Sequence, residues 1–203
     1  MSEALFDSVH AALSFAFRQR LQTVDRAPMN RAAAPAHGTG RGLGGLDGAA
    51  QAGMIRQEVE AFGELDKALL IARHAPRHSP CECGAPCCSG HRPNRAWVDA
   101  IAHLAEHMRT VALSSCSTTS LQRSAYVTRH FTPKAQRESI EELAARFEQS
   151  RHTVSAHVGR VSTVLGGTEA RKDKPAVPGI ETRARQLAED RFRALGWIGE
   201  HAA

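Results

Sequence analysis

Residues 139–147 and 150–165 are two segments of helical periodicity separated by only two residues, and this pair constrains the fold more than any other stretch. Apolar residues recur in both at the spacings of one helix face: Ile140, Leu143, Ala144 and Phe147 in the first, and Val154, Val158, Val161 and Leu165 in the second. Ser139 and Ser150 stand where N-caps are expected, and Gly166-Gly167 is a typical helix end. The pattern predicts two packed helices joined by a tight turn.

This layout is that of the helix-turn-helix, in which the second helix enters the major groove of DNA by its N-terminal residues. The second segment resembles the recognition helix of LuxR-type regulators and region 4 of bacterial sigma factors, over roughly residues 120–166. It departs from those families in the turn, where Glu148 and Gln149 replace the usual glycine and apolar residue. The alternative is a plain αα-hairpin inside a helical bundle.

The resemblance implies which residues would contact DNA. Ser150 would cap the recognition helix with its amides toward a phosphate, and Thr153 would reach backbone or base. The side chains expected to face the groove are Arg151, His152, Ser155, Ala156 and Arg160. The expected phosphate contacts outside this helix are Arg129, Lys134 and Arg137. An arginine in the groove can specify a base by a bidentate pair with guanine. Any one of these arginines could instead be ordinary surface charge.

Charge and composition agree with such a partner. The net charge of +5 and a pI of about 9.3 favour a polyanionic ligand, here double-stranded DNA. Alanine is abundant and aromatic residues are few, which favours helices over strands. The expected class is all-α, a helical bundle with an inserted zinc knuckle and a helix-turn-helix DNA-binding domain. No apolar run approaches the ~20 residues of a membrane span, and no signal-peptide pattern opens the chain, so we expect a cytoplasmic protein of a bacterial host cell.

A cluster of metal-ligand residue types lies within residues 81–91: Cys81, Cys83, Cys87, Cys88 and His91. Tetrahedral Zn²⁺ takes four such ligands, and in a reducing compartment a tight cysteine cluster indicates metal rather than disulfides. We expect Cys81, Cys83 and Cys88 as ligands, with Cys87 or His91 as the fourth. Ligands supplied wholly by protein predict a structural zinc site. A disulfide or reactive thiols are the alternatives, and Cys116 is expected in the core.

The run His103-Leu104-Ala105-Glu106-His107 matches the H-x-x-E-H signature of inverted zinc peptidases. On a helical wheel, however, the two histidines flank the apolar face and Glu106 lies nearly opposite its centre, so we expect solvent-facing side chains. No other constellation predicts catalysis. The chain is therefore expected to be a binding protein rather than an enzyme.

The chain divides in sequence into four regions: 1–75, 76–94, 95–168 with the helix-turn-helix at 139–166, and 169–203. Helices are expected over 3–21, 47–73, 95–113, 121–130 and 181–195. The glycine-rich stretch 38–45 is expected to be a linker. The combination of N-terminal helices, zinc knuckle and sigma-like motif also resembles, in architecture, the Q-type late-gene antiterminators of temperate phages. That likeness implies RNA polymerase or a sigma factor as a partner. An ordinary regulator would be a homodimer, and a protein-interaction module without DNA binding is the remaining alternative.

Overall fold

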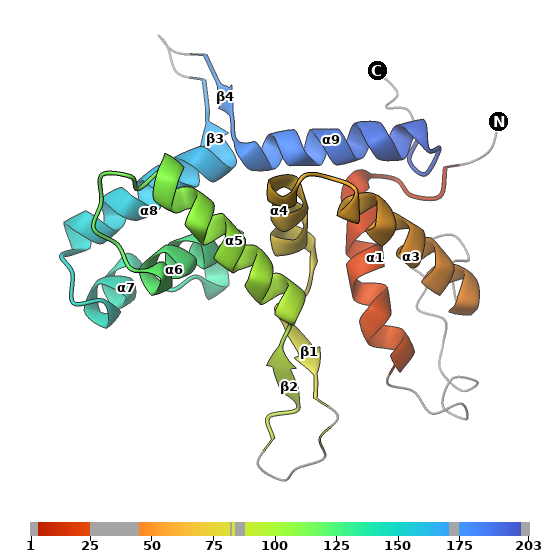
Figure 1. Cartoon of the computed structure of the whole chain (residues 1–203), viewed down its shortest axis with the longest axis horizontal. Coiled ribbons are helices and arrows are strands. Elements are labelled where there is room, and N and C mark those ends of the chain that lie inside the picture. The colour runs from red at the N-terminus through yellow and green to blue at the C-terminus, as the bar shows by residue number, and fades with distance from the viewer. Residues whose placement is uncertain (1–3, 25–44, 82, 84–87, 171–174, 200–203) are drawn as a thin grey trace. The chain divides into compact units, whose positions relative to one another are not determined.

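The computed structural model describes residues 4–24, 45–81, 83, 88–170 and 175–199. Most of them are helical, which confirms the expected helical class (Figure 1). Two antiparallel two-stranded hairpins, which the sequence did not predict, interrupt the helices. The chain forms two compact units, one made of Met1–Val98 together with Arg185–Ala203 and the other of Asp99–Ala184. This division joins the two ends of the chain, unlike the four consecutive regions expected.

In the first unit, α1 (Val9–Val24), α3 (Gly45–Glu60) and α4 (Glu64–His74) pack on one another. Their buried faces are made of small and branched apolar residues: Val9, Ala12, Leu13, Ala16, Ala52, Ile55, Val59, Leu69 and Leu70. The C-terminal residues close this core, because Phe6 donates its backbone N–H to the carbonyl of Trp197 at 2.9 Å and forms a parallel bridge with Ile198. Trp197 and Ile198 therefore dock within the chain.

Two expected helices of this unit are wrong in their bounds. The helix expected over 3–21 begins only at Val9, because residues 4–8 run as the bridge segment to the C-terminal end. The helix expected over 47–73 is two helices, and the break falls at Gly63, which has an extended ψ of 149° and precedes the first turn of α4. Glycine does not favour a helix interior, and Glu64 and Asp66 favour a new N-terminus.

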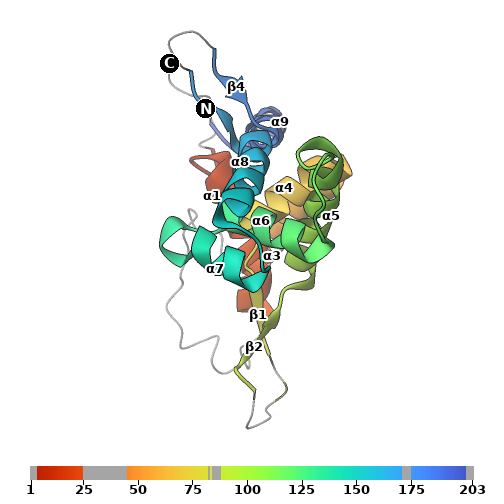
Figure 2. The same ribbon diagram turned by 90° about the vertical axis from the view of Figure 1, so that its left-hand side faces the viewer.

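The second unit contains most of α5 (Arg95–Val111), then α6 (Ser120–Phe131), the short 3₁₀ helix η1 (Lys134–Gln136), α7 (Ile140–Arg146) and α8 (Arg151–Gly166). Both α6 and α7 pack on α8 (Figure 2). Thr119 and Ser139 each form a capping box, with Gln122 and Glu142 respectively. The fully buried core includes Leu104, Met108, Leu113, Tyr126, Val127, Leu143, Val154, Val161 and Leu165.

The end of α8 is locked by a second hairpin, β3 (Gly167–Thr168) with β4 (Val177–Pro178). Gly167 ends the helix with φ +83°, as expected for a glycine helix end. A Cβ on Gly167 would collide with the carbonyl of Val177, and one on Gly179 would collide with that of Leu165. Glycine is therefore required at both positions for the close approach of the two backbones.

The last helix, α9 (Ile180–Ala194), agrees with the expected range. Its buried stripe runs through Ala184, Ala188 and Phe192, whereas Leu187 and Leu195 are exposed. At the end of α5, Val111 is exposed and Leu113, which follows the helix, is buried. Within the described ranges, no helix combines the length and apolar character needed to cross a bilayer.

Candidate nucleic-acid interface and metal centre

The turn between α7 and α8 is a Schellman motif. The N–H of Glu148 bonds to the carbonyl of Ala145 at 3.3 Å, and the N–H of Gln149 bonds to that of Ala144 at 3.0 Å. This pairing requires a left-handed residue after the helix, and Glu148 adopts it with φ +51°, the one non-glycine residue of positive φ in the described structure. The chain therefore makes the tight turn without the glycine that such turns favour, and Glu148 carries the strain.

Ser150 caps α8, as expected, by accepting the N–H of Thr153 at 3.1 Å. The two hydroxyl groups of these residues lie 2.8 Å apart. Beyond the cap, the outer face of α8 is exposed, and it contains every residue expected to face the groove: Arg151, His152, Ser155, Ala156 and Arg160. The structure therefore brings these five side chains to one solvent-facing surface.

The inner face of α8 differs from the expected one at a single position. Val154, Val161 and Leu165 are buried, but Val158 is only half-buried and His157 takes its place. The His157 ring packs at 5.9 Å from the Tyr126 ring, and its Nδ1 has no hydrogen-bond partner among the described residues. Burial, with a smaller contribution from Arg160, lowers the pKa of His157 below its ordinary value. The ring is therefore neutral at pH 7.

Two residues of the outer face already have partners on the protein. The Nε of Arg151 pairs with the carboxylate of Glu141 on α7 at 2.8 Å, with both side chains largely exposed. Such exposed pairs contribute little, so a phosphate or base could displace Glu141. The Nη1 of Arg160 donates to the Sγ of Cys116 at 3.0 Å. Cys116 is half-buried rather than a core residue, and sequence reasoning missed this contact because the two residues are 44 positions apart.

The expected phosphate contacts divide into two kinds. Arg129 donates to the backbone carbonyl of Glu138, and Arg137 donates through Nε to the carbonyl of Thr132 at 2.7 Å. Both therefore brace the segment between α6 and α7. Lys134 is exposed on η1 and stays a candidate for contact with a phosphate.

The cysteine cluster lies at the end of the first hairpin, β1 (His78–Pro80) with β2 (His91–Pro93). The ladder continues to the cysteines, because the N–H of Cys81 bonds to the carbonyl of Gly90 at 2.8 Å. At the other end, Asn94 caps α5 and donates its side-chain amide to the carbonyl of Pro76 at 2.7 Å. The hairpin therefore connects the end of α4 to the start of α5.

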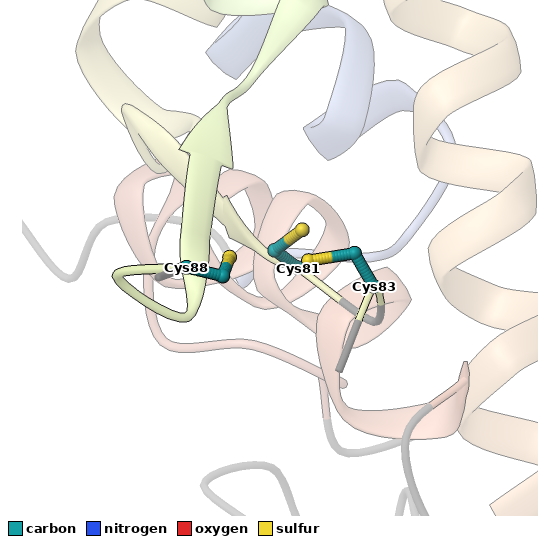
Figure 3. A group of neighbouring side chains, drawn as sticks. All are labelled: Cys81, Cys83 and Cys88. Carbon is teal, nitrogen blue, oxygen red and sulfur yellow. The ribbon is translucent and has the colours of Figure 1, made fainter. Parts of the chain in front are cut away.

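The thiols of Cys81, Cys83 and Cys88 converge, with their sulfur atoms within 4.8 Å of one another (Figure 3). Sulfur atoms of a tetrahedral zinc site lie ~3.8 Å apart for Zn–S bonds of ~2.3 Å, so the three thiols fit a metal ion. The pKa of Cys81 is raised: the backbone hydrogen bond from Cys83 lowers it, but the side chains of Cys83 and Cys88 outweigh that effect.

Cys87 or His91 was expected as the fourth ligand. Cys87 lies outside the described residues. His91 is exposed, its Nδ1 lies 3.1 Å from the carbonyl of Ser89, and its ring is not part of the group of converging ligands.

The H-x-x-E-H run does not form a metal site among the described residues. His103 and Glu106 are exposed, as expected from the helical wheel, but His107 is half-buried and not solvent-facing as expected. The carboxylate of Glu106 pairs with Arg109 and, at 3.3 Å, with the Nη2 of Arg123. The pKa of Glu106 is lowered, first by the hydrogen bond from Arg109, so this carboxylate serves as an ion-pair partner.

The chain matches no protein-family model, no curated protein and no solved structure. Functional inference therefore depends on the residues and their geometry alone.

Proposed function

We propose that the protein is a sequence-specific DNA-binding transcription regulator, in which α7 and α8 act as a helix-turn-helix. In this proposal α8 lies in the major groove, with its first turns against base edges and with Ser150 and the neighbouring amides near a phosphate. Arg151 and Arg160 would be the residues that read guanine or contact phosphate. Lys134 would add a phosphate contact from η1.

One observation carries the proposal: the outer face of α8 is polar, basic and open along its length. The exposed residues in its first three turns are Arg151, His152, Ser155, Ala156, Gly159 and Arg160. Three of them are small, which allows a helix to approach base edges closely. No acidic residue occurs between Arg151 and Gly166, so nothing on this helix repels a phosphate backbone. A helix that served only as one wall of a bundle would not need this combination.

We further propose that the β1–β2 hairpin is a structural zinc knuckle. Cys81, Cys83 and Cys88 would bind the ion, and the fourth ligand would be Cys87 or His91. Zn²⁺ supplies rigid tetrahedral bonds to thiolates and no reaction at a closed site of this kind. At one end of the hairpin Cys81 would bind the ion while its N–H continues the ladder to Gly90, and at the other end Asn94 would fix the first residues of α5 to the carbonyl of Pro76.

The test of DNA binding is selection and sequencing of genomic fragments on purified protein, beside an Arg151→Ala/Arg160→Ala variant. An Arg183→Ala/Arg185→Ala variant is the matched control, because both arginines are exposed on α9 and the same charge is lost. We expect enrichment of one short site by the native protein and the control, and its loss in the α8 variant. Equal enrichment of the same site by all three would place the readout of the bases outside Arg151 and Arg160 and overturn the proposed role of α8.

The absence of any enrichment at low salt, with the metal confirmed present, would leave the rival function, a zinc-stabilised protein-interaction module. A selected site inside a promoter would instead make a pull-down of RNA polymerase or sigma factor the next measurement. Retention of polymerase together with read-through of a terminator would support the narrower proposal of a phage-type late-gene antiterminator. Binding as a homodimer to a palindromic site would support an ordinary regulator.

A further inference from the structure

A polar pocket of ≈ 460 Å³ lies in the second unit, between the end of α5, the serine- and threonine-rich loop after it, and the first turn of α6. Its lining is dominated by hydrogen-bond donors: the guanidinium groups of Arg109 and Arg123 and the hydroxyls of Thr110, Ser114, Ser117 and Thr118. None of its lining residues is acidic. A concave site whose side chains are mainly donors, two of them cationic, is complementary to an oxyanion.

One of the two arginines that line the pocket is buried and held in place. Arg123 is only 7% exposed, and its Nη1 donates to the carbonyl of Thr118 at 2.6 Å and its Nη2 to Glu106. Its Nε and the Oγ1 of Thr118 have no hydrogen-bond partner among the described residues, and both atoms are too deeply buried to contact a ligand that enters from solvent. Arg123 therefore acts on the pocket by its charge, whereas the exposed Arg109 and the serine hydroxyls would supply the direct contacts.

The local charge also favours an anion. Glu106 pairs with both Arg109 and Arg123, so two guanidinium groups and one carboxylate leave a net charge of +1. A further guanidinium, that of Arg160 on α8, lies 3.0 Å from the Sγ of Cys116, which is itself a lining residue. The same contact places the pocket next to the proposed DNA-reading helix.

We propose that this pocket is a binding site for a phosphate group. Guanidinium and hydroxyl donors arranged around one cavity suit the several oxygens of a phosphate, and the volume lies within the ~300–1,000 Å³ range of small-ligand sites. The phosphate has two chemical sources, a small phosphomonoester or a backbone phosphate of DNA held on α8. Only the second source depends on the proposed function; the site itself does not.

The test is calorimetric titration of the full, metal-loaded chain with inorganic phosphate at low ionic strength. Ser117→Ala and Arg109→Gln are the test variants, and Arg183→Gln is the control, because it removes an exposed arginine of the same unit away from the pocket. Ser117→Ala is the sharper variant. Ser117 is exposed and lines the pocket, so the fold should lose nothing when its hydroxyl is removed.

We expect each test variant to weaken phosphate binding about tenfold, the loss of one charge-assisted hydrogen bond, and the control to change it less than twofold. Equal affinity of the native protein and all three variants would overturn the proposal, as would the absence of phosphate binding by the native protein.

A second arm identifies the source. Phosphate is titrated into the protein saturated with its selected DNA site. Loss of phosphate binding in the complex would show that a DNA phosphate occupies the pocket, whereas unchanged affinity would show a site for a small phosphomonoester. If no DNA site is selected, the proposed function fails while the first titration still decides the phosphate site.

Discussion

The α7–α8 pair and the cysteine hairpin are both tight reversals of the chain, but different forces hold them. The α7–α8 turn is flanked by two capped helices whose inner residues, such as Leu143 and Val154, are completely buried. The hairpin has strands of three residues, and those of β2 are all exposed. Two-stranded hairpins without an apolar face are marginal in water. The hairpin therefore needs a further source of stability, and the three converging thiols are where a metal ion would provide it.

The two regions are therefore expected to tolerate different substitutions. In the α7–α8 pair, stability comes from a core that tolerates a poor turn residue such as Glu148. In the hairpin, stability would come from one ion, so the loss of one ligand removes most of it. The following experiments test this contrast, beginning with the largest expected effect.

Removal of the metal, by a chelator or by Cys81→Ser, should unfold the β1–β2 hairpin. Structural zinc sites contribute on the order of 10 kcal/mol of apparent binding free energy, far more than a short ladder. The measurements are metal content by mass spectrometry and protease cleavage within residues 78–93. Cys116→Ser is the matched control and should keep the metal, because Cys116 is not part of the converging cluster. A Cys81→Ser protein that retained its metal would contradict the inference that the cysteine ligands of a metal ion stabilise the hairpin.

Leu143→Ala should lower the free energy of unfolding by about 2–5 kcal/mol, since this side chain of α7 is completely buried. The measurement is urea unfolding followed by circular dichroism. Leu121→Ala is the control: that side chain is 69% exposed, so a change within about 0.5 kcal/mol is expected. The Leu143→Ala effect should be the same after chelation, and a dependence on metal would show that the two regions are not stabilised separately.

Glu148→Gly should raise the free energy of unfolding by about 0.5–1 kcal/mol. Relief of the left-handed strain exceeds the entropy that glycine adds to the unfolded chain. Thermal unfolding measures this shift. Gln149→Gly is the neighbouring control and should destabilise, because Gln149 lacks a positive φ and accepts a hydrogen bond from the Tyr126 hydroxyl at 3.4 Å. Destabilisation by Glu148→Gly would indicate that its side chain is required in the turn.

Acid should lower the free energy of unfolding of the second unit by protonating His157. This is the smallest of the four effects predicted in these experiments. The folded pKa lies below the ordinary 6.5, so the unfolded chain binds the proton first. The contribution of neutral His157 to the free energy of unfolding is therefore fully present above pH 6.5. It is lost as the pH decreases through 6.5 toward the folded pKa. His157→Leu should flatten this pH dependence. His107, whose pKa is also lowered by burial and by His103, would leave a residual slope. If the His157→Leu variant were as sensitive to acid as the native protein, the pH dependence of stability would have to come from other groups.

The sequence predicted well the features that are fixed locally. Ser139 and Ser150 cap helices as expected, because a cap needs only one side chain and the amides within three residues of it. The convergence of Cys81, Cys83 and Cys88 also follows from their closeness in the chain. The hairpin strands were missed because segments of two or three residues are too short to show alternation, and β1, β2 and β4 also contain proline.

Features that depend on distant partners were not predictable. His157 and Val158 both border the inner face of α8, and the Tyr126 ring on α6 decides between them. The phosphate pocket unites the end of α5, a polar loop and the start of α6, and no motif marks such a set. The contact of Arg160 with Cys116 depends on the same tertiary arrangement.

The pairing of Phe6 with Trp197 and Ile198 has a consequence for synthesis of the chain. Residues 99–184 form a continuous unit, and all of them are translated before Trp197 and Ile198. The first unit cannot close its core until those last partners emerge, although its helices are translated first. A unit built from both ends of the chain therefore cannot fold in the usual N-to-C order, and α1 and α3 wait for their C-terminal cover until translation has passed residue 198.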